Sequence, residues 1–314
     1  MDEKIATREA YGNALAEFGE KYPNFVVLDA DLAAATKTGV FKKKFPERFF
    51  DCGIAEGNMM SVAAGLAAAG KIPFASTFAM FAAGRAFEQI RNSIGYPHLN
   101  VKIGATHAGI TVGEDGATHQ CNEDLATMRS IPGMTIINPA DAVEARAAVE
   151  AAINYVGPVY LRFGRLAIPV FNDAATYKFE WGKGVQLAEG KDVTIIATGV
   201  MVDMALSARA TLAAEGIDAR VINIHTIKPL DREIVLAAAR DTGALVVAEE
   251  HNIIGGLGSA VAECLCEACP VPMMRVGVED TFGRSGKVPA LLEYYGLTPA
   301  NIVAKAKAAI AMKK

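Results

Sequence analysis

The chain has 314 residues, enough for two domains that each bury a hydrophobic core. A content of 52% hydrophobic and 21% charged residues is typical of a soluble globular protein, and the net charge of -4 provides no basic surface for nucleic acid. The apolar stretch 59–70 is too short to cross a bilayer, and the opening MDEKIATREA lacks a signal-peptide pattern, so we expect a cytoplasmic protein without membrane contact.

The first half of the chain alternates between helical and strand patterns. Helices are predicted at 7–22, 56–69 and 80–94. Short apolar runs predict buried strands at 25–30, 73–77, 101–105, 134–140 and 158–164. Buried strands that alternate with helices indicate a parallel, doubly wound sheet. We therefore expect an α/β domain at 1–170.

A mixed, polar segment rich in turn residues follows at 171–192, and we interpret it as a linker. A second α/β series begins after it. Strands are predicted at 193–199, 219–225, 244–251 and 273–279, with helices between them. The sequence therefore predicts a second, smaller doubly wound domain at 193–314.

Three of the five cysteines fall in the run CLCEAC at 264–269, a spacing that could suggest a metal site. No nearby histidine or second CxxC motif completes a tetrahedral set of ligands. Buried free thiols are the favoured interpretation, and we expect no metal site built by this chain alone.

The loop 106–120, THAGITVGEDGATHQ, is the most informative segment. It follows a predicted buried strand, and ligand sites of α/β proteins usually lie beyond such strands. Its glycines let the backbone approach a ligand closely. His107, Asp115 and His119 could therefore point into one small polar site, where histidine can transfer protons. A solvated glycine-rich turn is the alternative.

Two further segments carry candidate residues. Glu56, in GIAEGNM, begins the alanine-rich helix, where a glutamate ordinarily complements the helix dipole but could also meet a ligand. Phe78 and Phe81, in STFAMF, follow a predicted strand, where their rings could stack on a planar ligand. Aromatic residues at helical spacing more often belong to the core.

Taken together, these segments resemble a known family. GIAEGNM, STFAMF, THAGITVGEDGATHQ and EEHNIIGGLGSAVAE (249–263) stand in the order found in the C-terminal part of transketolases, and the resemblance covers essentially the whole chain. More specifically, the chain resembles the separate C-terminal subunit of split bacterial transketolases. The resemblance implies a pyrimidine-binding domain followed by a transketolase C-terminal domain. It also implies transfer of a two-carbon ketol unit from a ketose phosphate to an aldose phosphate through a thiamine diphosphate carbanion.

The resemblance further implies which residues hold the cofactor. Glu56 would hydrogen-bond N1′ of the aminopyrimidine and so act as a catalytic residue. Phe81 would stack on the same ring, and Phe78 would form a wall of the pocket. The family's unit for binding the diphosphate through magnesium, a strand followed by GDG and a later asparagine, is absent from this sequence.

Because of that absence, the resemblance implies a partner, the N-terminal transketolase subunit, which would hold the diphosphate and magnesium. The active site would lie at an interface within an α2β2 heterotetramer, in which this chain also pairs with itself. The alanine-rich helix after Glu56 suits close packing against the partner, although an ordinary core helix has the same composition.

The resemblance assigns five residues to the substrate. His119 would lie near the reacting carbonyl oxygen and assist proton transfer, and Asp115 would accept a hydrogen bond from the adjacent hydroxyl. His107, Arg8 and Arg165 would face the far end of the sugar, because the planar fork of arginine suits a phosphate.

Two departures from the family pattern leave the acceptor sugar open. The segment 31–37, DLAAATK, has alanines where the family often has a phosphate-binding serine, although Thr36 or Lys37 could substitute. Gly84 stands where a third pocket aromatic is expected. The substrates could thus belong to pentose phosphate metabolism or to catabolism of an unusual sugar, and a monovalent ion in the second domain stays open.

Other functions remain as alternatives. A deoxyxylulose phosphate synthase-like or 2-oxoacid dehydrogenase beta-like subunit would share the glutamate and the sheet order, but the paired histidines around GEDG favour ketol transfer. A non-catalytic assembly subunit is the alternative from another class. The presence of Glu56, Asp115 and His119 argues against it, because unpaired buried polar groups cost stability.

Overall fold

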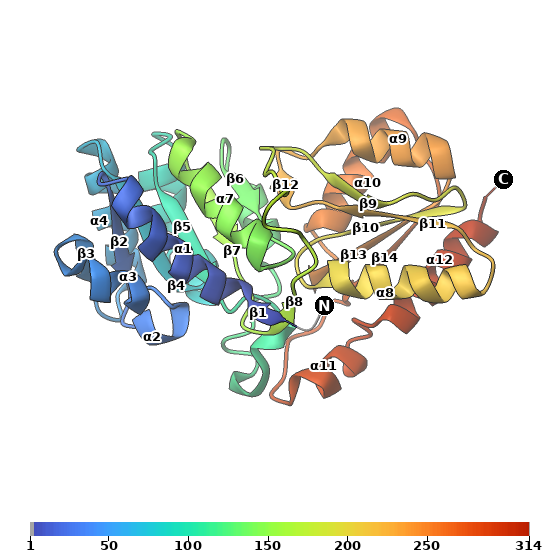
Figure 1. Cartoon of the computed structure of the whole chain (residues 1–314), viewed down its shortest axis with the longest axis horizontal. Helices are drawn as coiled ribbons and strands as arrows, with labels where there is room; N and C mark the ends of the chain where they lie inside the picture. The colour runs from blue at the N-terminus through green and yellow to red at the C-terminus, as the bar shows by residue number, and fades with distance from the viewer. Residues whose placement is uncertain (1–2, 314) are drawn as a thin grey trace.

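The computed structural model describes residues 3–313. Two large β-sheets lie side by side, one built mainly from the first half of the chain and the other from the second (Figure 1). Helices cover both faces of each sheet, because most strand residues are apolar and buried. The predicted fold class, α/β with two doubly wound sheets, is confirmed.

The first sheet has seven strands in the order β12-β6-β7-β5-β4-β2-β3. Its parallel strands are β2 (Phe25–Asp29), β3 (Phe49–Asp51), β4 (Ile72–Phe78), β5 (Lys102–Thr106), β6 (Thr135–Ile137) and β7 (Val159–Arg162). Five of these coincide with predicted strands. The sequence analysis did not find β3, which has only three residues.

Helices α1 (Thr7–Lys21) and α7 (Ala142–Asn154) cover one face of this sheet, and α4 (Glu56–Ala68) covers the other. The shorter helices of this half are α2 (Ala33–Thr36), α3 (Gly39–Lys44), α5 (Phe87–Gln89) and α6 (Asp124–Arg129). The single helix predicted at 80–94 is instead irregular. Two π-helical turns, Phe81–Arg85 and Ile90–Gly95, flank α5. Such wide turns inside helices frequently mark functional sites.

The second sheet has five strands in the order β14-β13-β10-β11-β9. Its strands are β9 (Val185–Ala188), β10 (Val193–Ala197), β11 (Ala219–Asn223), β13 (Leu245–Asn252) and β14 (Met273–Val278). The helices of this half are α8 (Met201–Ala214), α9 (Arg232–Thr242), α10 (Leu257–Ala268), α11 (Val288–Tyr294) and α12 (Pro299–Ala311). All four strands predicted here are present, and β9 is an addition.

Both sheets differ from the expectation of purely parallel strands. Strand β9 lies inside the segment 171–192 and pairs antiparallel with β11. Strand β12 (Thr226–Lys228) follows β11 in the chain, yet it pairs antiparallel with β6 of the first sheet. A further antiparallel pair joins β1 (Lys4–Ala6) to β8 (Ala167–Pro169). These strands have three or four residues each, too few for a periodic pattern in the sequence.

A buried ion pair helps to join the two halves of the chain. Arg162, at the end of β7, donates to both carboxylate oxygens of Asp124 at 2.8 and 3.1 Å, and both side chains are almost fully buried. Although burial opposes ionisation, the Arg162 guanidinium lowers the pKa of Asp124. Arg162 also donates to the backbone oxygen of Glu250 in β13 at 2.9 Å. Through Arg162 the pair therefore connects the carboxyl end of β7 in the first sheet with β13 in the second sheet.

None of the helices found among residues 3–313 combines the length and the apolar character needed to span a bilayer.

We predict that Asp124→Asn lowers the free energy of unfolding by about 3–5 kcal/mol, because it leaves the Arg162 charge buried without its partner. Urea unfolding at neutral pH measures the effect. Glu17→Gln is the matched control, since it removes one partner of the exposed Arg146–Glu17 pair and should cost less than about 1 kcal/mol. Equal losses in the two variants would contradict this account of the ion pair.

Candidate active site

All eight predicted site residues lie near the carboxyl ends of the strands in the first sheet. In parallel sheets this edge carries the ligand crevice, because the loops that leave neighbouring strands meet there. Strand β4 leads to the aromatic residues, β5 to the glycine-rich loop and β7 to Arg165. The eight residues are Arg8, Glu56, Phe78, Phe81, His107, Asp115, His119 and Arg165.

Glu56 is the first residue of α4, and its side chain is only 1% exposed. Its partner is Arg85, which the sequence analysis did not single out. One guanidinium nitrogen of Arg85 donates to both carboxylate oxygens, at 2.9 and 2.8 Å. Among residues 3–313 no other group donates a hydrogen bond to this carboxylate. The Arg85 side chain is 52% exposed, so a buried anion is paired with a cation that reaches solvent.

Four planar groups form a continuous stack beside this ion pair. The Arg85 guanidinium lies 4.7 Å from the centre of the Phe81 ring, within the range of a cation–π contact. Phe81 stacks on Phe78 at 5.7 Å with 12° between the rings, and Phe78 stacks on His107 at 3.8 Å. The stack therefore links the carboxylate at the start of α4 to the glycine-rich loop.

The ring of His119 makes T-shaped contacts with the two phenylalanine rings of the stack. Its ring lies 5.4 Å from Phe81 at 73° and 6.1 Å from Phe78 at 66°. The Nδ1 atom of His119 lies 2.9 Å from Oγ1 of Thr118, and Nε2 has no hydrogen-bond partner among residues 3–313. The structure thus places His119 beside both phenylalanine rings.

His107 is buried and held as a neutral imidazole. Burial, together with the nearby charges of Arg8 and Arg165, lowers the pKa of His107 to about 3. Arg8 Nη1 lies 3.2 Å from Nε2 of His107, and arginine can only donate, so Nε2 is the acceptor. The proton of the neutral ring is then on Nδ1, which lies 2.9 Å from Oγ1 of Thr106.

Asp115 and Arg165 form the outer part of the site. Arg165 Nη1 lies 3.8 Å from Oδ2 of Asp115, and both side chains are exposed by more than a third. The same Arg165 nitrogen also donates to the backbone oxygen of Val112. Arg8 donates to the backbone oxygen of Ala35 at 2.7 Å, which brings the alanine segment to this end of the site. Arg8 therefore contacts His107 directly, and the charge of Arg165 is close enough to lower the pKa of His107.

The two residues considered as substitutes for a phosphate-binding serine have other partners. Thr36 is fully buried, and its hydroxyl donates to Oδ2 of Asp29 at 2.7 Å, so this hydroxyl is not available to a ligand. Lys37 lies 3.3 Å from a carboxylate oxygen of Glu9 and stays partly exposed. Only Lys37 remains a candidate in this segment.

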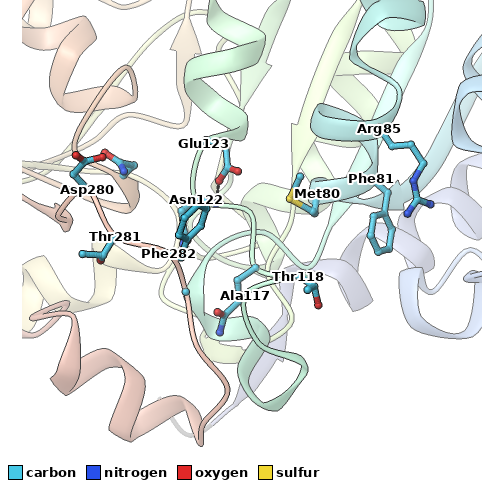
Figure 2. Close-up of a pocket in the computed structure, with 13 residues that line it drawn as sticks. Met80, Phe81, Arg85, Ala117, Thr118, Asn122, Glu123, Asp280, Thr281 and Phe282 are labelled. Carbon is cyan, nitrogen blue, oxygen red and sulfur yellow. Dashed lines mark hydrogen bonds between the residues drawn. The ribbon is translucent and has the colours of Figure 1, made fainter.

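A cleft of about 590 Å³ opens beside the stack, and the second half of the chain forms its other wall (Figure 2). Met80, Phe81 and Arg85 line one side. The opposite side has Thr281 and Phe282, from the loop after β14. This wall could not be predicted from the sequence, because the loop carries no motif of its own and lies far from the glycine-rich loop in the chain. No three His, Cys, Asp or Glu side chains are grouped as metal ligands in the described residues.

Stability should depend on pH through His107. Unfolded His107 takes up a proton near its ordinary pKa of 6.5, whereas folded His107 stays neutral down to about pH 3. The folded state therefore loses stability as the pH falls from about 6.5. We predict that His107→Gln reduces the slope of unfolding free energy against pH by up to about 1.4 kcal/mol per pH unit between pH 4 and 6.

Urea unfolding at several pH values measures this slope. His225→Gln gives a useful comparison, because burial lowers the pKa of His225 to about 4, and its effect should fade at a higher pH than that of His107. Identical slopes for the wild type and His107→Gln would show that His107 is not held neutral in the folded protein.

Comparisons with known proteins identify the family of the chain. The transketolase pyrimidine-binding domain family matches residues 3–170, and the transketolase C-terminal domain family matches residues 182–302. A protein of Methanocaldococcus jannaschii that carries the provisional name transketolase C-terminal section is 50% identical over 94% of this chain and 93% of its own length. The 6-deoxy-6-sulfo-D-fructose transketolase subunit of Clostridium sp. is 48% identical over 94% of this chain and 92% of its own length.

A solved structure is similar over the whole chain. It is described as a split gene transketolase, an inactive beta4 tetramer, and it is 57% identical with a TM-score of 0.93 over 99% of this chain and all of that chain. The two family matches and these relatives show that the chain belongs to the transketolase family.

Proposed function

We propose that this chain is the C-terminal subunit of a two-subunit transketolase, which transfers a two-carbon ketol unit from a ketose phosphate to an aldose phosphate. The observation that carries the proposal is the buried carboxylate of Glu56 beside the Phe81–Phe78–His107 stack, with His119 against the edge of the rings. This arrangement offers an acid–base group, a flat apolar surface and a histidine within one site.

The residues present fit the aminopyrimidine of thiamine diphosphate. A flat heterocycle with a ring nitrogen that can be protonated needs a carboxylate at its edge and an apolar ring against its face. Glu56 offers the carboxylate, whose only donor among residues 3–313 is the half-exposed Arg85, and Phe81 offers the ring. When bound, the cofactor supplies the nucleophilic carbon that carries the ketol unit. Glu56 would hold a proton at the pyrimidine nitrogen.

The other residues would bind and orient the sugar. His119 lies at the edge of the stack with a free Nε2, where it can exchange a proton with an oxygen at the reacting carbon. Asp115 is exposed and can accept a hydrogen bond from a hydroxyl group. Arg8 and Arg165 would bind an anion at the far end of the sugar, and His107 would position Arg8 by accepting its hydrogen bond. A relative is named for a sulfonated fructose, so this anion need not be a phosphate.

The partner would be an N-terminal subunit that holds the diphosphate and magnesium. Two relatives support this part of the proposal, because one is named as a C-terminal section and the other as a subunit, and this chain matches more than 90% of the length of each. We propose that the two kinds of chain form an α2β2 assembly, in which this chain contributes the aminopyrimidine side of each site.

Glu56→Gln should abolish ketol transfer while the two subunits still assemble, because an amide cannot hold a proton at the pyrimidine nitrogen. We expect a loss of several kcal/mol in transition-state stabilisation, that is, a decrease of about 10³-fold or more in kcat/KM. The assay mixes both subunits with magnesium, thiamine diphosphate, xylulose 5-phosphate and ribose 5-phosphate. Glu88→Gln, an exposed glutamate on the neighbouring helix, is the control and should keep full activity.

Unchanged turnover in Glu56→Gln would refute the role of Glu56. Consumption of pyruvate in place of the ketose by the wild type would refute ketol transfer and favour the deoxyxylulose phosphate synthase-like or 2-oxoacid dehydrogenase-like alternative. Full activity of the purified single chain would refute the need for a partner.

Arg165→Ala should raise KM for a phosphorylated acceptor about 10-fold or more and change kcat less, because a charge-assisted hydrogen bond to the distant phosphate is lost. The same variant should handle an unphosphorylated acceptor such as glycolaldehyde as the wild type does. An equal change in KM for both acceptors would contradict the assignment of Arg165 to the anionic end of the sugar.

A further inference from the structure

The guanidinium of Arg85 makes the two contacts that the proposed function gives to the cofactor. It is a flat, nitrogen-rich cation that donates to the Glu56 carboxylate at 2.8 and 2.9 Å. It also lies over the Phe81 ring at 4.7 Å. An aminopyrimidine that stacks on Phe81 and hydrogen-bonds Glu56 needs the same space and the same hydrogen-bonding atoms. The two groups therefore exclude each other.

The backbone geometry explains how Arg85 reaches both groups. Phe81 and Arg85 are the first and last residues of one π-helical turn, four positions apart, so their side chains share one face. Glu56 starts the neighbouring helix α4, whose first turn faces this turn. A single residue can thus cover the ring and pair with the carboxylate at once.

Of the three groups, only Arg85 is free to leave. Glu56 is 1% exposed at the start of its helix, and Phe81 is packed against Phe78. The Arg85 side chain is 52% exposed and lines the open cleft, and its only hydrogen bonds within the described chain are those to Glu56. Rotating Arg85 outward breaks this pair, and about half of the arginine side chain is already in solvent.

We propose that Arg85 is a placeholder for the aminopyrimidine. It neutralises Glu56 while the site is empty and swings into the cleft when the cofactor binds. This inference rests on the proposed function and adds a residue that sets the cofactor affinity. A buried carboxylate without a partner is strongly destabilising, so the placeholder keeps the empty site folded. Its displacement lowers the apparent affinity, because only the fraction of molecules with Arg85 swung out can bind.

The test is a calorimetric titration of thiamine diphosphate, with magnesium, into the complex of this chain with the N-terminal subunit. Arg85→Ala should lower the dissociation constant about 10-fold relative to the wild type, because no guanidinium has to be displaced. An equal or higher dissociation constant for Arg85→Ala would overturn the inference.

Added methylguanidinium gives a second readout that does not depend on activity. In the Arg85→Ala complex, millimolar methylguanidinium should fill the place of the missing side chain and raise the dissociation constant of thiamine diphosphate competitively. In the full-length Arg85→Ala chain alone, it should also raise the melting temperature, which the substitution lowers. The wild type should respond to methylguanidinium in neither measurement. If methylguanidinium has no effect on Arg85→Ala, or the same effect on Arg85→Ala as on the wild type, the proposal that Arg85 is a placeholder is wrong.

Arg85→Lys separates the charge of Arg85 from its planar shape, and Arg91→Ala is the matched control. Arg85→Lys keeps a positive charge for Glu56 but has no planar group to lie on Phe81, so its dissociation constant should fall between those of the wild type and Arg85→Ala. If Arg85→Ala folds poorly, the dissociation constant of Arg85→Lys tests the proposal in its place. Arg91→Ala removes an exposed arginine six positions further on that does not contact Glu56, and it should bind the cofactor as the wild type does.

The outcome distinguishes the two proposals. If the complex binds thiamine diphosphate and the wild type and Arg85→Ala do so equally, the placeholder is wrong and the proposed function stands. If no variant of the complex binds the cofactor, the proposed function fails and the placeholder fails with it.

Discussion

A carboxylate that is almost fully buried requires a hydrogen-bond donor, and Glu56 is the point on which this site depends. Its position at the first residue of α4 gives it favourable contact with the helix dipole, but the dipole alone does not replace lost water. Arg85 provides the missing donor and at the same time covers the face of Phe81. Phe81 stacks on Phe78, Phe78 stacks on His107, and His107 is hydrogen-bonded to Arg8. The Glu56–Arg85 ion pair therefore lies at one end of a continuous row of contacts.

The second half of the chain holds the glycine-rich loop 106–120 in place. Glu250 in β13 accepts a hydrogen bond from the backbone N–H of Thr111 at 2.6 Å, and burial raises the pKa of Glu250. Gly109 permits this approach, since its φ of +78° suits glycine and an added Cβ would lie 2.4 Å from the Glu250 carboxyl carbon. The loop that carries Asp115 is thus fastened to the second sheet, and the two sheets together shape the cleft.

The sequence was sufficient for the parts of the fold that have strong patterns. All nine predicted strands are present, because fully buried parallel strands are continuous apolar runs in the sequence. Four motifs in the right order predicted the family. Strand β12 could not be predicted, because three residues carry no periodicity and because β12 joins β6 in the first sheet, although β11 before it in the chain belongs to the second sheet. The segment 80–94, predicted as one helix, consists of two π-helical turns on either side of α5. The spacing of apolar residues does not distinguish such turns from a regular helix.

Several residues of the site could not be assigned from the sequence, because their roles depend on contacts between distant segments. Arg85 lies inside the segment that drew attention to Phe81, but an arginine on a helix is usually a solvated surface residue. Only the structure shows that Arg85 lies over Phe81 and is paired with Glu56. The hydroxyl of Thr36 could not be excluded as a ligand until its bond to Asp29 was seen. Thr281 and Phe282 reach the cleft only because the second sheet lies beside the first.

The most direct measurement is a crystal structure of the two-subunit complex with thiamine diphosphate bound. The account predicts that a carboxylate oxygen of Glu56 lies within hydrogen-bond distance of the pyrimidine nitrogen, that Phe81 stacks on this ring, and that Arg85 has moved into the cleft. A bound cofactor whose pyrimidine lies elsewhere, with Arg85 still paired to Glu56, would contradict it.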